Sequence, residues 1–339
     1  MQARNASTSR LGIADAARAI QLCREGSIDD GIALYIQVIN TKDDCGRRPQ
    51  LPVGIHLRLL EDAGLTDAAA AIRHSAVMAG HNVCIGTAFK KPPDEIVAEY
   101  RELFADGIVN SAMVADYLVE LSKLNEIAEL TEFIDPDRLF RRTEISIDDD
   151  DAPKEQFWNT VASTLLEQQS EDNWQEAVQS VHGMNYIRLA DHRAPCIQRV
   201  LKEIHNHVSR YVADIGTGGT ALPWVPQAFR LSAWALISSG FGYNSPHIHP
   251  KGWITGVLYV AGPDEIDPDG NPVGALRIGP PRGIENTVGW PNFAVAPKPG
   301  TLVLMPSYFT HWTTPLGRPG LRISIAFDVI DLRIEQTES

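Results

Sequence analysis

The spacing of apolar residues changes near residue 229, and this change limits the possible folds more than any other feature. Up to about residue 142, apolar residues recur every three or four positions, as in Ile32, Tyr35, Ile36 and Ile39, which is typical of amphipathic helices. Two further helices are expected at 157–169 and 194–212. Short apolar or alternating runs, separated by Gly, Pro, Asn and Asp, follow at 228–238, 254–262, 274–279, 301–307 and 321–330. The pattern predicts an α+β protein, helical at first and then an antiparallel β-sandwich or barrel.

The helical region is predicted to form a domain over residues 1–147. Its segment AARAIQLCREGSIDDGIALYIQVIN resembles a degenerate tetratricopeptide repeat, with Ala17, Gly26, Ala33 and Tyr35 near the small and aromatic positions. A helical domain of no repeat family is an equal alternative. Four adjacent aspartates at 148–151 repel one another and resist burial, so residues 148–154 are predicted to be a solvated linker. The second domain is expected over residues 155–339.

Composition narrows the choice of partners and of cellular location. The formal net charge is −13 and basic residues form no stripe, which argues against a nucleic-acid partner because such partners are bound through Lys and Arg. No apolar run has the length of a membrane span, and the first residues contain no apolar secretory segment. The four cysteines have no paired spacing, which suits a reducing compartment. A cytoplasmic enzyme or binding protein is therefore expected.

Three histidines in the last third of the chain form the strongest candidate site. His247 and His249 flank one residue, so on an extended segment their rings point to the same side. His311 follows a buried strand and a Pro-Ser break, and it completes the set if the chain folds back as a small barrel. Each histidine alone could be an ordinary loop residue. Together, neutral imidazoles on one face indicate a metal site.

Arg322 adds a positive charge to this candidate site. Alternation along the last predicted strand puts Arg322, Ser324 and Ala326 on one face, so that this face carries a charge and a hydroxyl inside an otherwise apolar strand. A buried guanidinium needs a partner because its desolvation is costly. That partner is either an acid on a neighbouring strand or the carboxylate of a bound molecule, which Arg binds in a bidentate manner.

In this order, the four residues resemble the Fe(II)/2-oxoglutarate-dependent oxygenases, whose usual signature is HxD or HxE, a distal His, and then Arg-x-Ser. The segments HIHPKGWITGVLYV and GTLVLMPSYFTHWTTP resemble a bacterial branch of that family, some members of which carry tetratricopeptide repeats. The resemblance covers about residues 229–330. It implies a double-stranded β-helix of the jelly-roll or cupin type, with Fe(II), 2-oxoglutarate and O2 as cofactor and co-substrates.

Carried over by position, His247 and His311 are iron ligands, and Arg322 with Ser324 binds the remote carboxylate of 2-oxoglutarate. Tyr243 and Thr255 are expected in the same pocket. The third ligand departs from the family, because position 249 is His where the signature has a carboxylate. We therefore predict a three-histidine site, one negative charge short of the usual triad, to which a carboxylate from elsewhere could be added.

The resemblance implies hydroxylation of a substrate, with release of succinate and CO2. The substrate is expected to be a small metabolite, an amino acid or a peptide, and the helical domain could bind a protein partner. Candidate substrate contacts are Trp253, Arg277, Trp290 and Trp312, for each of which a packing role is equally compatible with the sequence.

Two other function classes stay open. A cupin-type dioxygenase could use the same three histidines without 2-oxoglutarate, although Arg322 and Ser324 argue against it. A non-catalytic scaffold of helical repeats and an inactive barrel is the other. A zinc hydrolase is disfavoured, because no Asp or Glu near the histidines presents itself as a general base.

Overall fold

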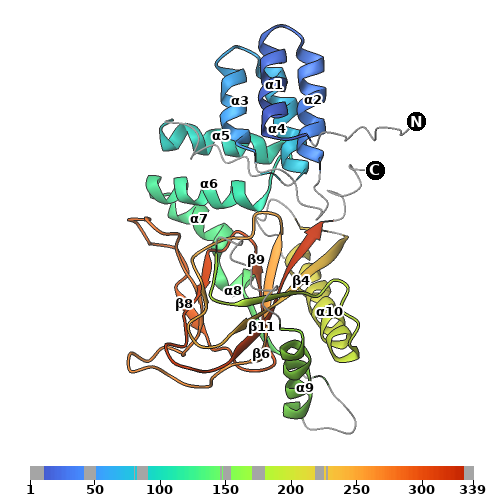
Figure 1. Ribbon diagram of the computed structural model, residues 1–339. Helices are drawn as coiled ribbons and strands as arrows, with labels where there is room; N and C mark the ends of the chain where they lie inside the picture. Colours follow the sequence, from blue (N-terminus) through green and yellow to red (C-terminus); the bar gives the residue numbers. More distant parts are fainter. Residues whose placement is uncertain are drawn as a thin grey trace, which may run out of the picture. The chain divides into compact units, whose positions relative to one another are not determined.

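The computed structural model describes residues 11–41, 51–79, 81, 91–145, 147, 154–169, 180–217, 225–226 and 228–331. These residues divide into two compact units, with the boundary between Asp116 and Tyr117 (Figure 1). The boundary falls inside helix α6 (Ser111–Leu124). The predicted linker at 148–154 lies outside the described residues except for Lys154, and the predicted domain limits remain a prediction.

Helices build the first unit, as the periodicity predicts: α1 (Ile13–Arg24), α2 (Ile28–Asn40), α3 (Val53–Glu61), α4 (Thr66–Met78) and α5 (Pro93–Ala105). α1 packs on α2, α3 packs on α4, and α2 also contacts α4. Gly26 turns the chain between the first pair with a positive φ of 96°, a conformation that glycine adopts without strain. Gly31 lets α1 and α2 approach closely, since a Cβ there would overlap Cys23 Sγ and the Ala19 carbonyl oxygen. The tetratricopeptide-like assignment of this region remains a prediction.

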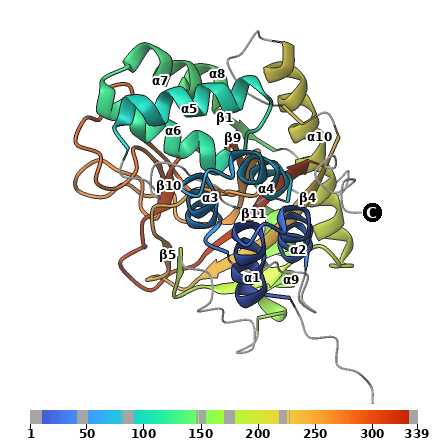
Figure 2. The ribbon, with the colours of Figure 1, turned by 90° about the horizontal axis from the view of Figure 1, so that it is seen from above.

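The second unit also contains helices: α7 (Ile127–Ile134), α8 (Pro136–Leu139), α9 (Lys154–Glu167) and α10 (Pro195–Thr217). The two helices predicted at 157–169 and 194–212 correspond to α9 and α10. α9 packs against strand β6 (Ile254–Ala261), and α10 packs against α9 and strand β9 (Thr301–Pro306) (Figures 1 and 2). The side chains of Val200, Ile204 and Val208, spaced by four residues along α10, are fully buried. No described helix is both long and apolar enough to cross a membrane.

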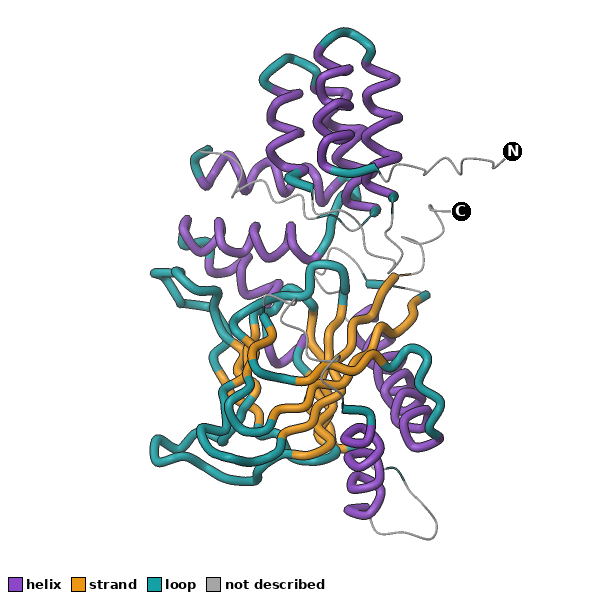
Figure 3. The backbone as a smooth tube through the Cα atoms, viewed as in Figure 1, coloured by secondary structure: helices purple, strands orange, loops and turns teal. Residues whose placement is uncertain are grey.

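A six-stranded antiparallel sheet is the centre of the second unit (Figure 3). Its order is β1–β9–β6–β11–β4–β3, so β11 (Arg322–Asp331) lies between β6 and β4 (Phe229–Ser238). β3 (Asn185–Arg188) and β1 (Arg141–Glu144) are the edges. β1 corrects the prediction that helix continues to about residue 142. Its four polar residues, Arg-Arg-Thr-Glu, have no apolar period of their own, and pairing with β9 makes them a strand.

Two smaller antiparallel sheets complete the unit. One has the order β10 (His311–Thr313), β7 (Leu276–Ile278) and β8 (Phe293–Val295), and the other pairs β2 (Val181–His182) with β5 (Tyr243–Asn244). The α+β class, with a helical N-terminal region and antiparallel strands after it, is therefore confirmed. The finer assignment as a double-stranded β-helix remains a prediction.

Candidate metal and co-substrate site

A cavity of about 490 Å³ lies against one face of the six-stranded sheet. Alternate residues of β11 line it, namely Ser324, Ala326 and Asp328, as the sequence alternation predicts for the first two. The strand register places Thr255 of β6 beside Asp328 and Tyr259 of β6 beside Ser324. The cavity thus has two ends along β11, one near Asp328 and the other near Ser324, while Arg322 lies beyond the second end and does not line the cavity.

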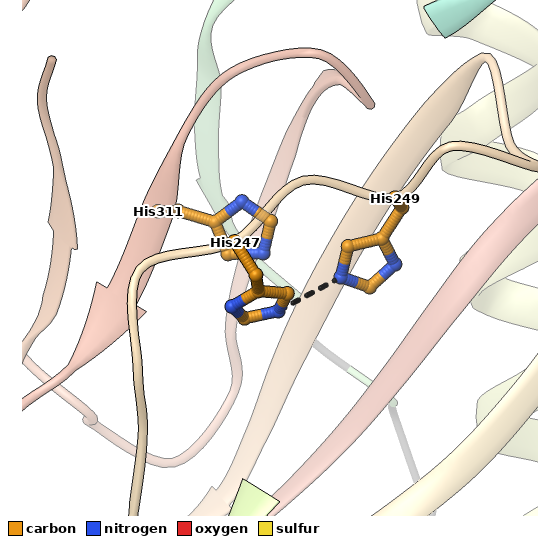
Figure 4. Close-up of side chains that lie close together, drawn as sticks. All are labelled: His247, His249 and His311. Atoms are coloured by element: carbon orange, nitrogen blue, oxygen red, sulfur yellow. Dashed lines mark hydrogen bonds between the residues drawn. The ribbon is translucent and has the colours of Figure 1, made fainter. Parts of the chain in front are cut away.

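The three predicted histidines come together at the first end (Figure 4). Their potential ligand atoms all lie within 4.8 Å of one another. His247 and His311 are joined by two backbone hydrogen bonds, each N–H donating to the other residue's carbonyl oxygen at 3.0 Å. The His249 N–H donates to the Ser307 carbonyl oxygen at 2.9 Å. Backbone pairing therefore brings His247 and His311 side by side, although they are more than sixty positions apart in the sequence.

The outer ring nitrogen of each histidine has an acceptor. Nδ1 of His247 is 2.7 Å from the Ser245 carbonyl oxygen, and Nδ1 of His311 is 2.8 Å from that of Phe309. Nδ1 of His249 is 2.6 Å from the Asp328 carboxylate. Because a carbonyl or carboxylate oxygen only accepts, each Nδ1 carries the proton, which leaves the Nε2 lone pair for a metal.

Burial favours the neutral form of two of the three imidazoles. Burial lowers the pKa of His247 to about 4, with His249 adding a repulsive contribution. Burial also lowers the pKa of His311 well below its usual range. The Nε2 atoms of His247 and His249 are 3.2 Å apart, whereas two metal-bound imidazoles at right angles would be about 3 Å apart for metal–nitrogen bonds of ~2.1 Å. The donor set and its spacing fit a divalent transition metal.

Asp328 is a site residue that the sequence analysis missed. It occupies the next inward position of β11 after Ala326, so the alternation that selected Arg322 and Ser324 also indicates it. Thr255 Oγ1 lies 3.2 Å from the same His249 nitrogen and donates its own proton to the Phe327 carbonyl oxygen at 3.1 Å. Thr255 therefore lines the cavity, as predicted, but near the histidines.

Arg322 marks the second end, and its side chain is buried with a residue exposure of 2%. Nη1 donates to the carbonyl oxygens of Gly274 and Thr314 at 2.9 and 2.7 Å. Nη2 donates to the Gly242 carbonyl oxygen at 3.0 Å and to Thr313 Oγ1 at 3.2 Å. No ion pair joins it to an acid among the described residues, so the alternative of a protein acid as its partner finds no support there.

Tyr259 is a second residue that the sequence analysis missed. Its hydroxyl is buried and has no hydrogen-bond partner among the described residues. Burial raises the pKa of Tyr259 to about 12, and the nearby Arg322 charge opposes this. Ser324, on the neighbouring strand, also lines the cavity. An unpaired buried hydroxyl is costly, and this one lies near the buried positive charge of Arg322.

The other predicted residues lie elsewhere. Tyr243 does not line this cavity, because its ring stacks on His182 with centroids 4.7 Å apart and is partly exposed. It borders a neighbouring cavity of about 410 Å³ together with Trp312. Trp253 is buried, and its backbone hydrogen-bonds to Val329 and Ser307.

Arg277 and Trp290 each form a hydrogen bond with another side chain of the protein. Arg277 donates to the Asn271 Oδ1 atom at 2.8 Å, and it pairs across the strands with Trp312. Trp290 Nε1 donates to Ser122 Oγ at 3.2 Å. Neither residue lines the cavity of the histidines.

Comparison with known families agrees with the motif. Residues 232–328 match a family model described as "Putative 2OG-Fe(II) oxygenase". The matched range runs from β4 to β11 and contains the three histidines, Tyr259, Arg322 and Asp328. The family resemblance of this region, with Fe(II) and 2-oxoglutarate as the cofactors that the family's description names, is confirmed by the match. The match covers less than a third of the 339 residues, and no match was found among curated proteins.

Several solved structures are similar to parts of the chain. A prolyl-4-hydroxylase from Pseudomonas putida is 13% identical with a TM-score of 0.43, covering 60% of this chain and 98% of its own. A Trichoplax adhaerens prolyl hydroxylase, solved with a hypoxia-inducible-factor peptide, is 14% identical with a TM-score of 0.42, covering 64% and 96%. HygX from Streptomyces hygroscopicus, solved with nickel and 2-oxoglutarate, is 11% identical with a TM-score of 0.37, covering 58% and 84%.

Proposed function

We propose that this chain is an Fe(II)- and 2-oxoglutarate-dependent oxygenase in which His247, His249 and His311 hold the iron. The observation that carries the proposal is the common arrangement of the three rings: each Nδ1 has an acceptor on its outer side, and the Nε2 atoms converge. Iron bound there would supply the open coordination positions at which the co-substrate and O2 react. The two sheets facing the cavity would be the layers of a jelly roll.

The second end of the cavity would bind the remote carboxylate of 2-oxoglutarate. Arg322 supplies a buried positive charge, and Ser324, Thr313 and Tyr259 supply hydroxyls that face the same cavity or lie beside that charge. The Tyr259 hydroxyl, which has no described partner, would donate to the carboxylate. Because both terminal nitrogens of Arg322 already donate to protein acceptors, the guanidinium would act mainly through its charge.

The walls of the cavity would exclude water and place the substrate. Apolar side chains dominate them, including Val181, Leu236, Ile248 and Met305. Trp234 stacks on His249, with ring centroids 5.9 Å apart, and Tyr186 stacks on Trp234. The substrate would be a small molecule, an amino acid or a peptide segment, and its oxidation would be coupled to release of succinate and CO2.

A second candidate is a three-histidine dioxygenase that does not use 2-oxoglutarate. The terminal nitrogens of Arg322 each have neutral acceptors, so a purely structural role of this guanidinium is compatible with its contacts. The two functions differ in whether 2-oxoglutarate binds to the metal-loaded protein and whether succinate is released.

Anaerobic titration of the Fe(II)-loaded protein with 2-oxoglutarate tests the proposal. We expect a visible charge-transfer band that saturates with the co-substrate, and slow succinate formation when O2 is admitted. Ser324→Ala should weaken the titration, while Ser209→Ala on the exposed face of α10 should not change it. Metal binding without a response to 2-oxoglutarate would favour the second candidate.

A further inference from the structure

The metal end of the cavity contains a carboxylate that the three-histidine motif does not include. Asp328 Oδ1 is 2.6 Å from Nδ1 of His249, with side-chain exposures of 15% and 12%. The carboxylate is thus mostly removed from water and aimed at one ring. A buried carboxylate is costly unless it is hydrogen-bonded, so this contact fixes both partners.

The position of Asp328 in the sheet is tightly constrained. It pairs with Thr255 on β6 and with Ser232 on β4, in the middle of the sheet. Gly252 makes room for it, because a Cβ at 252 would lie 3.1 Å from the Asp328 Cβ and 2.8 Å from Ser307 Oγ. Backbone pairing on both sides therefore fixes the Cα of Asp328, and the missing side chain at Gly252 leaves space for the Asp328 carboxylate beside His249.

Of the three imidazoles, His249 alone has a charged acceptor. His247 and His311 donate to backbone carbonyl oxygens, whereas His249 donates to a carboxylate. A carboxylate on the outer nitrogen of a metal-bound imidazole orients the ring and makes its inner nitrogen a stronger ligand. His249 is also the position at which the usual family signature has a carboxylate ligand, so the extra charge is beside the ligand that lacks it.

We propose that Asp328 is a positioning residue. Acting through His249, it supplies the negative charge that the metal site lacks because position 249 is a histidine and not a carboxylate. This inference rests on the proposed metal site. The His249 ring lies between the carboxylate and the Nε2 cluster, so Asp328 acts through the imidazole and does not itself bind the metal. The result is a centre with three imidazole ligands and one carboxylate, hydrogen-bonded to the outer nitrogen of His249.

The test measures metal affinity, not only turnover. Anaerobic Fe(II) and Co(II) dissociation constants would be compared for wild type, Asp328→Asn and Asp328→Ala, with unfolding of the metal-free proteins followed in parallel. Asp328→Asn keeps an oxygen beside Nδ1 and removes the charge. The control is Asp264→Asn, which removes the same charge from an exposed side chain paired with Lys298.

We expect Asp328→Asn to weaken metal binding about tenfold and Asp328→Ala by about 10- to 100-fold, the range found for such outer carboxylates. The control should bind as wild type does. If Asp328→Asn stays within about twofold of wild type, where such a carboxylate normally contributes tenfold or more, the inference is wrong.

A second pair of variants tests whether the charge of Asp328 acts on the ligand at position 249. His249→Asp alone would place a new carboxylate close to that of Asp328, and two like charges at this distance disfavour each other and the folded site. His249→Asp combined with Asp328→Asn removes the repulsion and should bind Fe(II) at least about tenfold more tightly than His249→Asp alone, a non-additive result typical of contacting residues. Additive effects would contradict the proposal.

Failure of this inference can be told apart from failure of the proposed function. If wild type binds Fe(II) and 2-oxoglutarate while Asp328→Asn behaves identically, only the role of Asp328 is wrong. If metal affinity depends on Asp328 but 2-oxoglutarate never binds, the role of Asp328 holds and the co-substrate assignment is wrong. Lack of metal binding by wild type would overturn both.

Discussion

The two ends of the cavity on β11 satisfy their polar groups in opposite ways. At the histidine end, every outer nitrogen has an acceptor, and the three inner nitrogens converge with their lone pairs unused. At the Arg322 end, the terminal nitrogens of the guanidinium have neutral acceptors, and among the described residues the Tyr259 hydroxyl has no hydrogen-bond partner and the guanidinium has no ion-pair partner. The histidine end is therefore suited to bind a cation, and the Arg322 end is suited to bind an anion.

This difference indicates how each end should respond to substitution. At the histidine end each ring makes one hydrogen bond through Nδ1 and offers Nε2 to a ligand, so loss of a ring should affect metal binding more than folding. The Arg322 end holds loop carbonyls from three separate segments, near Gly242, Gly274 and Thr314, so its loss should affect both.

The largest effect is expected for His311→Ala. Removing one of three ligands should weaken Fe(II) binding by more than the roughly 100-fold upper range for outer-sphere residues. Isothermal titration or chelator competition would measure it. His205→Ala on the exposed face of α10 is the control and should bind as wild type does. Undiminished binding by His311→Ala would exclude this residue as a ligand.

Arg322→Ala should lower the free energy of unfolding by about 3 kcal/mol, because buried carbonyl oxygens lose their donors at about 1–3 kcal/mol each. Arg322→Lys, which keeps the charge with fewer donors, should recover part of that stability and part of the affinity for 2-oxoglutarate. Urea unfolding and the anaerobic titration would separate the two effects. If the titration is unchanged in a folded Arg322→Lys protein, the guanidinium is structural and the second candidate function gains support.

The pH dependence of the metal-free protein should report the buried imidazoles. In the unfolded chain, His247 is protonated as the pH falls below the usual histidine pKa of 6.5. In the folded protein its pKa is about 4, so it is protonated only near that pH. Folding stability from this residue is therefore full above pH 6.5 and is lost as the pH falls toward 4, with a slope of up to about 1.4 kcal/mol per pH unit. His311 adds a further loss of the same sign.

Urea unfolding in the presence of a chelator, at several pH values in this interval, would measure the slope. The matched comparison is His247→Ala combined with His311→Ala, which should have a flatter profile. Equal slopes for the two proteins would show that the imidazoles are not held neutral in the folded state.

The smallest effect is expected for Tyr259→Phe. Removing a buried hydroxyl that has no described partner should leave the metal-free protein as stable as wild type or slightly more stable. The same change should weaken 2-oxoglutarate binding several-fold, about 1 kcal/mol, if the hydroxyl donates to the carboxylate. Tyr308→Phe is a useful contrast, because that buried hydroxyl donates to the Phe133 carbonyl oxygen and should cost stability instead.

Local pattern was sufficient for much of the fold. Period-four spacing gave α10 and its buried stripe, and alternation gave the inward face of β11 from Arg322 to Ala326. It failed for β1, whose polar residues become a strand only by pairing with β9. Tertiary pairing overrides local preference most easily in such short edge segments.

The candidate site was predictable where it depends on side-chain identity and not where it depends on the backbone. The three histidines could be selected because few residue types bind metals, whereas the acceptors of Arg322 are mainly carbonyl oxygens, which any residue provides. Asp328 was within reach of the alternation argument, two positions past Ala326. Tyr259 was not, because its significance lies in a missing hydrogen bond that only a three-dimensional arrangement reveals.

The main-chain bridge between His247 and His311 has a further consequence for how such a protein could evolve. The separation of these two positions is set by N–H and carbonyl groups, which do not depend on the imidazoles. A descendant that replaced either ring would keep the geometry of the pocket while losing the chemistry. A lost ligand could therefore be regained by a single substitution, because the backbone would still hold both positions side by side.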